Sequence, residues 1–137
     1  MSKIAVIYWS GTGNTEAMAR AVAEGAGADL FSVSEIDIDQ ALSYDGLAFG
    51  CPSMGAEVLE ESEFDPFFTV IESKLSGKKV ALFGSYGWGD GEWMRDWEVR
   101  TKATGADLFE DGLIINETPD AAGIDECLAF GKRFSSL

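Results

Sequence analysis

Continuous apolar runs alternate along this chain with stretches in which apolar residues recur at helical spacing. The apolar runs predict strands over residues 3–9, 29–33, 46–51, 79–84 and 113–115. Helical spacing predicts helices over residues 15–25, 64–75, 92–104 and 125–134. Because the strand runs are apolar at consecutive positions, we expect these strands to be buried on both faces. The alternation predicts one α/β domain over residues 1–137, with a parallel sheet between helices on both faces.

Composition narrows the class of protein. A chain of 137 residues with 46% apolar residues can bury a core without disulfide or metal staples. Cys51 and Cys127 lie far apart and neither belongs to a C-x-x-C pair, which excludes a four-thiolate iron–sulfur or zinc site within one chain. No run of 18 apolar residues and no signal-peptide layout is found, so we expect a cytoplasmic protein that uses no membrane.

The charge of the chain is strongly negative. Ten basic and 24 acidic residues leave a net charge of −14, and the interval between Arg20 and Lys74 holds acidic residues but no basic ones. Nucleic acid and anionic membranes are poor partners for such a surface because both require basic contacts. Two interpretations remain open: a solvated acidic face, or electrostatic steering toward basic docking sites on protein partners.

Three unusual loops follow predicted strands. Their sequences are SGTGNT (residues 10–15), PSMGAE (52–57) and SYGWGDG (85–91). In parallel sheets, ligands bind beyond the carboxyl ends of the strands. We therefore expect these loops to form one binding site, without a metal.

The first loop favours a phosphate. It lacks the lysine of a P-loop, and Glu16 stands where a dinucleotide fingerprint requires its third glycine. What remains is a set of backbone N–H groups at a helix N-terminus, together with the hydroxyls of Ser10, Thr12 and Thr15. The alternative is an ordinary glycine turn with a capping threonine. Since no cation is available to stabilise phosphoryl transfer, the phosphate is interpreted as an anchor for a larger ligand.

The third loop favours a planar ligand. Trp88 stands between two glycines and close to Tyr86. The flanking glycines predict a flexible backbone that presents the large indole ring. A flat ligand stacked on the indole explains this arrangement better than a surface aromatic folded onto the domain. Trp93 and Trp97, four residues apart on a predicted helix, and Trp9 at a strand end are interpreted as packing residues.

The motifs SGTGNT, CPSMGAE and GSYGWGDGEWM together resemble the flavodoxins, and the resemblance extends over essentially the whole chain. Its length and uninterrupted last strand resemble the short-chain branch of clostridial type. The resemblance implies a flavodoxin-like three-layer sandwich whose five-stranded parallel sheet has the order 2-1-3-4-5. It also implies a one-electron carrier, not an enzyme, with noncovalently bound FMN that cycles between semiquinone and hydroquinone.

The resemblance also assigns roles to the three loops. The residues implied to hold the FMN phosphate are Ser10, Gly11, Thr12, Gly13, Asn14 and Thr15. Those implied to border the ribityl chain and the ring are Pro52, Ser53, Met54, Gly55, Ala56, Glu57, Ser85, Tyr86, Gly87, Trp88 and Gly89.

Within the second set, the resemblance implies specific contacts with the flavin. Met54 would cover the inner face of the ring and Trp88 the outer face. Gly55 would present its carbonyl to N5, and Glu57 would accept a hydrogen bond from N3–H. Backbone groups of the glycines beside Trp88 would meet the pyrimidine oxygens.

Two features of the sequence support these roles independently. Gly55 permits the positive φ that a type II′ turn requires, so the 55–56 peptide can invert at little steric cost and form a redox-dependent hydrogen bond. A reduced anionic flavin inside a protein of charge −14 is destabilised, which predicts a low potential.

An NAD(P)H-dependent flavin or quinone reductase on the same fold is the alternative of another class. Such an enzyme needs a second pocket and usually a cation for its phosphates, whereas this chain has no histidine and no second glycine-rich phosphate loop. A regulatory module that uses FMN as a sensor also stays open. The expected partners of a carrier are redox enzymes with basic docking surfaces, such as ferredoxin-type oxidoreductases, met by a monomer.

Overall fold

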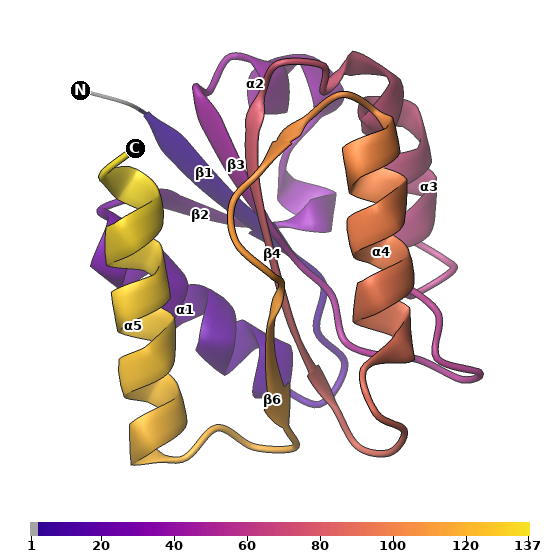
Figure 1. The fold of residues 1–137 in the computed structure, drawn as a ribbon, viewed down its shortest axis with the longest axis vertical. Helices are drawn as coiled ribbons and strands as arrows, with labels where there is room; N and C mark the ends of the chain where they lie inside the picture. Colours follow the sequence, from indigo (N-terminus) through magenta and orange to yellow (C-terminus); the bar gives the residue numbers. More distant parts are fainter. Residues whose placement is uncertain (1–2) are drawn as a thin grey trace.

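A computed structural model of the chain describes residues 3–137, in which the strands form one parallel sheet (Figure 1). The strands are β1 (Ile4–Tyr8), β2 (Asp29–Ser32), β3 (Gly46–Gly50), β4 (Lys79–Tyr86), β5 (Asp107–Leu108) and β6 (Leu113–Asn116). The order is β2-β1-β3-β4-β5, and β6 also pairs with β4. This confirms the predicted parallel sheet and its 2-1-3-4-5 order. All of β3 is buried, as its continuous apolar run predicts.

The predicted last strand, residues 113–115, is found unbroken as β6, but the fifth position of the sheet also holds a second short strand, β5, that the sequence did not predict. β5 pairs with the beginning of β4 and β6 with its end. Between them Glu110 has a φ of 53°, in the left-handed region, and its carboxylate pairs with Arg133 at 2.9 Å. The N–H of Gly112 donates to Glu98 of α4 at 2.6 Å. These contacts tie the segment between β5 and β6 to α5 and α4, and a short divided edge strand resists pairing with other chains.

Helices cover both faces of the sheet, as predicted (Figure 1). They are α1 (Asn14–Ala26), α2 (Ile38–Leu42), α3 (Phe64–Ile71), α4 (Glu92–Ala103) and α5 (Ala121–Ser135), with 3₁₀ turns at Val33–Glu35 and Glu72–Lys74. α1 and α5 pack on one face and α3 and α4 on the other. Among residues 3–137, no helix has the length and apolar character needed to cross a bilayer.

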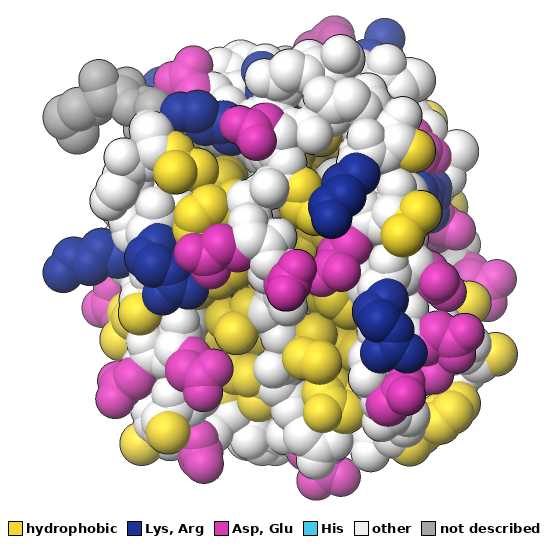
Figure 2. Space-filling view, in the orientation of Figure 1, with side chains coloured by type: hydrophobic (Ala, Val, Ile, Leu, Met, Phe, Trp, Pro, Cys, Tyr) yellow, Lys and Arg dark blue, Asp and Glu magenta, His cyan; other side chains and the backbone are white. Residues whose placement is uncertain are grey.

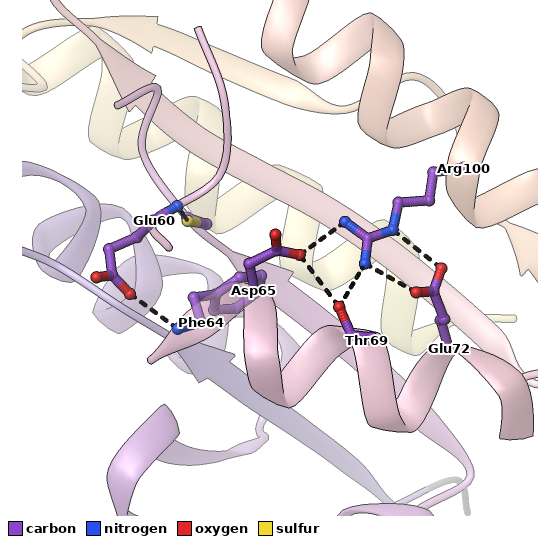
Figure 3. Close-up of polar contacts among 7 residues, drawn as sticks. Glu60, Phe64, Asp65, Thr69, Glu72 and Arg100 are labelled. Atoms are coloured by element: carbon purple, nitrogen blue, oxygen red, sulfur yellow. Dashed lines mark hydrogen bonds and ion pairs between the residues drawn. The ribbon is translucent and has the colours of Figure 1, made fainter. Parts of the chain in front are cut away.

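An arginine joins the two helices of one face (Figure 3). Arg100 of α4 donates to both carboxylate oxygens of Glu72 at 2.9 and 2.8 Å, to Asp65 at 2.8 Å and to Thr69 at 3.0 Å. Its guanidinium also lies 5.0 Å from the centre of the Phe68 ring. The hydrogen bonds to Glu72, with those to Asp65, outweigh partial burial and raise the pKa of Arg100. The network holds α4, and hence the loop that precedes it, against α3.

The Glu60 side chain caps the N-terminus of α3. Glu60 lies three residues before Glu63, the residue that directly precedes the helix. Its carboxylate accepts hydrogen bonds from the N–H groups of Ser62, Glu63 and Phe64, each at 2.8 Å, and from the Ser62 hydroxyl. Its own N–H donates to Cys51 Sγ at 3.3 Å, across to the end of β3. Burial alone would raise the pKa of Glu60, but the hydrogen bonds from the Ser62 hydroxyl and the three amides lower it. The cap anchors the segment that links β3 to α3.

The Glu60→Gln variant is expected to unfold more easily than the wild type by about 1–2 kcal/mol at pH 7, because charge-assisted bonds to the helix N-terminus are lost. A lowered pKa in the folded state means that the carboxylate stabilises the fold fully above its unfolded pKa, about 4.3. This stabilisation disappears as the pH falls through the folded value. Urea unfolding at several pH values measures it, and exposed Glu61→Gln is the control. A difference between wild type and Glu60→Gln that persists in full at pH 2 would contradict the role of the charge.

Candidate functional site

A cleft of about 230 Å³ lies where β1, β3 and β4 end. It is lined by Trp9, Ser10, Gly11, Thr12, Asn14, Thr15, Pro52, Ser53, Met54, Ser85, Tyr86, Gly87 and Glu117. The structure thus brings together residues from all three loops that the sequence indicated. None of the lining residues, among those that the structure describes, is a lysine or an arginine.

The first loop leaves the N-terminus of α1 open toward the cleft. Gly13 has a φ of 98° and no side chain caps the helix. The Ser10 hydroxyl accepts from the N–H of Gly13 at 3.1 Å and keeps its own hydrogen available. The first helical N–H groups, from Asn14 onward, cannot have partners within the helix. Such a set of donors at the positive end of a helix is suited to an anion.

Thr15 differs from the other hydroxyl residues of this loop. Its side chain is buried and lies 2.9 Å from the Ser85 hydroxyl, and it accepts from the N–H of Ser85 at 3.3 Å. One of the two hydroxyl hydrogens forms the hydrogen bond between Thr15 and Ser85, and the other stays available for donation. Because both residues line the cleft, the pair can supply that single donor to a ligand. From the sequence, Thr15 was interpreted as an independent hydrogen-bond donor. Its hydrogen bonds to Ser85, near the end of β4, were not predicted.

The second loop turns sharply at Gly55. Met54 and Val58 exchange two backbone hydrogen bonds of 2.8 and 2.9 Å, closing a turn over residues 55–57. Gly55 has a φ of 49°, so the positive φ predicted there is confirmed. Glu57 also lies in the left-handed region, at a φ of 57°, although it is not a glycine. Met54 lines the cleft, while the exposed tip of the turn lies outside the cleft wall.

The carboxylate of Glu57 lies between the second and third loops without a complete set of partners. Glu57 is 8% exposed, and its Oε1 atom has no hydrogen-bond partner among the described residues. A Cβ placed on Gly89 would lie 2.2 Å from this oxygen, so a larger residue there would require the Glu57 carboxylate to move. A buried carboxylate oxygen without a donor is unfavourable. The arrangement therefore fits a ligand that brings an N–H group to this point.

The third loop places its tryptophan outward. Trp88 is 63% exposed, and it does not line the cleft. Of the residues that the sequence assigned to the site, those outside the cleft wall are Gly13, Gly55, Ala56, Glu57, Trp88 and Gly89. Trp93 and Trp97 are buried in the core as predicted, and the Trp93 indole N–H donates to the carbonyl of Cys51 at 3.2 Å.

Two residues that line the cleft were not predicted from the sequence. Trp9, interpreted as a packing residue, forms part of the cleft wall, and its indole N–H donates to Glu63 at 3.2 Å. Glu117 belongs to a fourth loop, after β6, and its N–H donates to the carbonyl of Tyr86 at 2.7 Å. In the same loop Thr118 donates to Asn14 at 3.0 Å. The predicted strand over residues 113–115 also ends at this edge of the sheet. This was the signal that could have identified the loop after β6 as part of the site.

The electrostatic surroundings of the cleft are negative. Acidic side chains are distributed over the face that carries α4 and α5, with lysine and arginine between them (Figure 2). Several arginines are already engaged in exposed ion pairs, Arg20 with Glu16 at 2.6 Å and Arg95 with Asp90 at 2.9 Å. With a net charge of −14 and Glu117 in the cleft wall, an anion bound here would rely on hydrogen bonds and the helix dipole.

Comparisons with known proteins agree with this geometry. The sequence profile of the flavodoxin family matches residues 6–131. The flavodoxin of Clostridium beijerinckii is 53% identical over 137 residues, covering 96% of this chain and 99% of that protein. The flavodoxin of Megasphaera elsdenii is 51% identical over 134 residues, covering 94% and 96%.

The fold comparison gives the same result. The solution structure of two-electron reduced Megasphaera elsdenii flavodoxin matches with a TM-score of 0.88 and 44% identity, over 98% of this chain and 99% of that chain. The resemblance to short-chain flavodoxins of clostridial type is confirmed, and the reductase alternative is not supported. The chain therefore belongs to the flavodoxin family, a family of FMN-binding electron-transfer proteins rather than enzymes.

Proposed function

We propose that this chain is a low-potential one-electron carrier that holds FMN noncovalently in the cleft at the ends of β1, β3 and β4. Bound FMN supplies the redox chemistry, because its ring accepts and releases single electrons. The observation that carries the proposal is the buried Glu57 Oε1, which has no donor among residues 3–137 and lies against Gly89 of the third loop. The open N-terminus of α1 at the other end of the site supports it.

At the phosphate end, residues 10–15 bind the phosphate through hydrogen bonds without neutralising it. The donors are the hydroxyls of Ser10 and Thr12, the single hydrogen that the Thr15–Ser85 pair retains, and the first N–H groups of α1. Gly11, Gly13 and Asn14 complete the loop. The helix dipole adds a favourable field for the negative charge.

At the ring end, Met54 would cover one face of the flavin and Trp88 the other. The Glu57 carboxylate accepts from N3–H, and the N–H groups of Gly87 and Gly89 donate to the pyrimidine oxygens. The positive φ of Gly55 would allow the 55–56 peptide to present its carbonyl to flavin N5.

The ribityl chain lies between these two ends. It passes along Pro52, Ser53, Ser85 and Tyr86, all of which line the cleft. Ala56 stays exposed at the tip of the turn.

The surroundings of the site suit a strong reductant. An extra negative charge on the reduced ring is disfavoured by a phosphate that no cation neutralises, by Glu57 and Glu117, and by the net charge of −14. The acidic surface guides the carrier to basic docking sites on redox enzymes, ferredoxin-type oxidoreductases among them. Residues 1–137 act as one domain and one monomer in the cytoplasm.

Stepwise reduction of the purified protein tests the proposed function. Apoprotein mixed with FMN is expected to give a yellow complex in a ratio of one to one. Dithionite should then reduce it in two separate one-electron steps visible by absorbance, whereas NADPH alone should reduce it very slowly. A protein that does not bind FMN would overturn the assignment of the site. Rapid reduction by NADPH alone would overturn the carrier role.

The Trp88→Ala variant is expected to bind FMN about three- to tenfold more weakly than the wild type, because a stacking contact with the ring is lost. Its flavin should also fluoresce more strongly, since the indole no longer quenches it. Trp88→Phe should restore most of the affinity, and exposed Val99→Ala on α4 is the control for an apolar surface truncation. Fluorescence titration measures all four proteins. Equal affinity of Trp88→Ala and wild type would leave Trp88 without a role in binding.

A further inference from the structure

A second cavity, of about 180 Å³, adjoins Glu57 between the 57–59 segment, α3 and α4. Its lining includes Glu57, Asp65, Trp93, Asp96, Trp97 and Arg100. Glu57 contributes to this cavity and also lies against Gly89 of the third loop. The cavity is thus separate from the cleft assigned to FMN but shares one residue with the proposed flavin contacts.

Besides Glu57 Oε1, a second polar group of a residue that lines this cavity has no partner among the described residues. The Trp97 side chain is 1% exposed, and among the described residues its indole N–H finds no acceptor. Trp93, one turn earlier on the same helix and equally buried, donates its indole N–H to the Cys51 carbonyl at 3.2 Å. The two indole N–H groups therefore differ: among the described residues, that of Trp93 has a protein acceptor and that of Trp97 has none. A buried donor without a protein partner usually bonds to ordered water.

The cavity offers what an ordered water requires. It is large enough for more than one water, and a stable water needs two to four polar partners. Asp65 and Asp96 line the cavity together with Glu57, and carboxylates can accept hydrogen bonds, whereas an indole N–H can only donate one. Arg100 holds Asp65 in place through a hydrogen bond of 2.8 Å, as Figure 3 shows. The wall therefore combines a fixed donor with several acceptors around one small space.

We propose that this cavity is a water-binding site in which ordered water links the Trp97 indole N–H to the Glu57 carboxylate. Trp97 is then a positioning residue for Glu57. The water would hold Oε2 from the α4 side, and Oε1, the oxygen nearer to Gly89, would be left for the flavin. The inference rests on the proposed function in one point only, namely that Glu57 contacts the flavin. The water site itself does not depend on that contact.

NMR of the FMN-bound wild-type protein tests the water site directly. The indole N–H of Trp97 is expected to show cross-relaxation with water, while that of Trp93, bonded to Cys51, shows none. Trp97→Phe and Trp93→Phe assign the two signals. Absence of water contact at the Trp97 indole in the folded holoprotein would overturn the proposal, whatever the effect of the variants on folding.

A double-mutant cycle tests the positioning role. Trp97→Phe removes the N–H but keeps an aromatic ring, and it is expected to weaken FMN binding by about three- to tenfold. In a Glu57→Ala background the same change should have no further effect, because there is no carboxylate left to hold. If Glu57→Ala weakens binding and the two losses simply add, this inference fails alone. If Glu57→Ala leaves the affinity unchanged, the flavin contact of Glu57 fails, and the positioning role fails with it.

Discussion

Replacing Thr12 with valine is expected to weaken FMN binding by about ten- to hundredfold while leaving riboflavin binding nearly unchanged. Thr12 is exposed at the mouth of the cleft, so the variant should keep its stability. A hydrogen bond to a charged phosphate contributes about 1.5–3 kcal/mol, and riboflavin has no phosphate with which to make it. Calorimetric titration of the apoprotein with both ligands measures the two affinities, and their ratio reports the contribution of the phosphate.

Thr15→Val provides the contrast to this result. The Thr15 hydroxyl is buried and bonded to Ser85, so its loss should lower the free energy of unfolding as well as the affinity for FMN. Thr12→Val should affect the affinity alone. Equal losses of FMN and riboflavin affinity in Thr12→Val would place the phosphate outside residues 10–15.

The large elements could be predicted because their signals are local. An apolar run such as residues 46–51 encodes a strand buried on both faces, and β3 is buried throughout. The phosphate loop could be located because its glycines and hydroxyl residues stand together in one stretch. α2 was missed because five residues are too few to display a helical period. α5 begins at Ala121, earlier than expected, where the Asp120 side chain caps it through the N–H of Gly123 at 2.8 Å.

The details of the site could not be predicted because they depend on residues distant in the chain. The Thr15–Ser85 pair joins positions from two loops, and Glu117 reaches the cleft only through the pairing of β6 with β4. Nothing near Glu57 in the sequence shows that its carboxylate will be buried against Gly89. These contacts join residues that are distant in the sequence and become neighbours only when the strands align in the sheet. Local sequence patterns therefore do not predict them.

The Gly55→Thr variant is expected to bind oxidised FMN almost normally. Its formation constant for the one-electron-reduced state should be lower than that of the wild type by a factor of about ten to one hundred. Gly55 has a φ of 49°, and a Cβ placed there would meet nothing within 4 Å. Any effect of the substitution therefore comes from backbone conformation and not from a clash. A β-branched residue at positive φ is strained by about 1–3 kcal/mol. Because φ is already positive in the structure described, part of this strain is common to all states and cancels in the binding of oxidised FMN. The redox-dependent part would arise when the 55–56 peptide must turn its carbonyl toward N5.

The potential of the first electron should accordingly fall by about 60–120 mV, and the separation of the two one-electron potentials should narrow. Spectroelectrochemical titration at one pH and one salt concentration measures both potentials. Ala56→Thr is the matched control, because residue 56 is exposed in the same turn but does not have a positive φ. It adds the same side chain one position later and should leave the potentials close to those of the wild type. A Gly55→Thr protein that binds FMN normally and keeps the wild-type separation of potentials would show that inversion of this peptide does not stabilise the one-electron state.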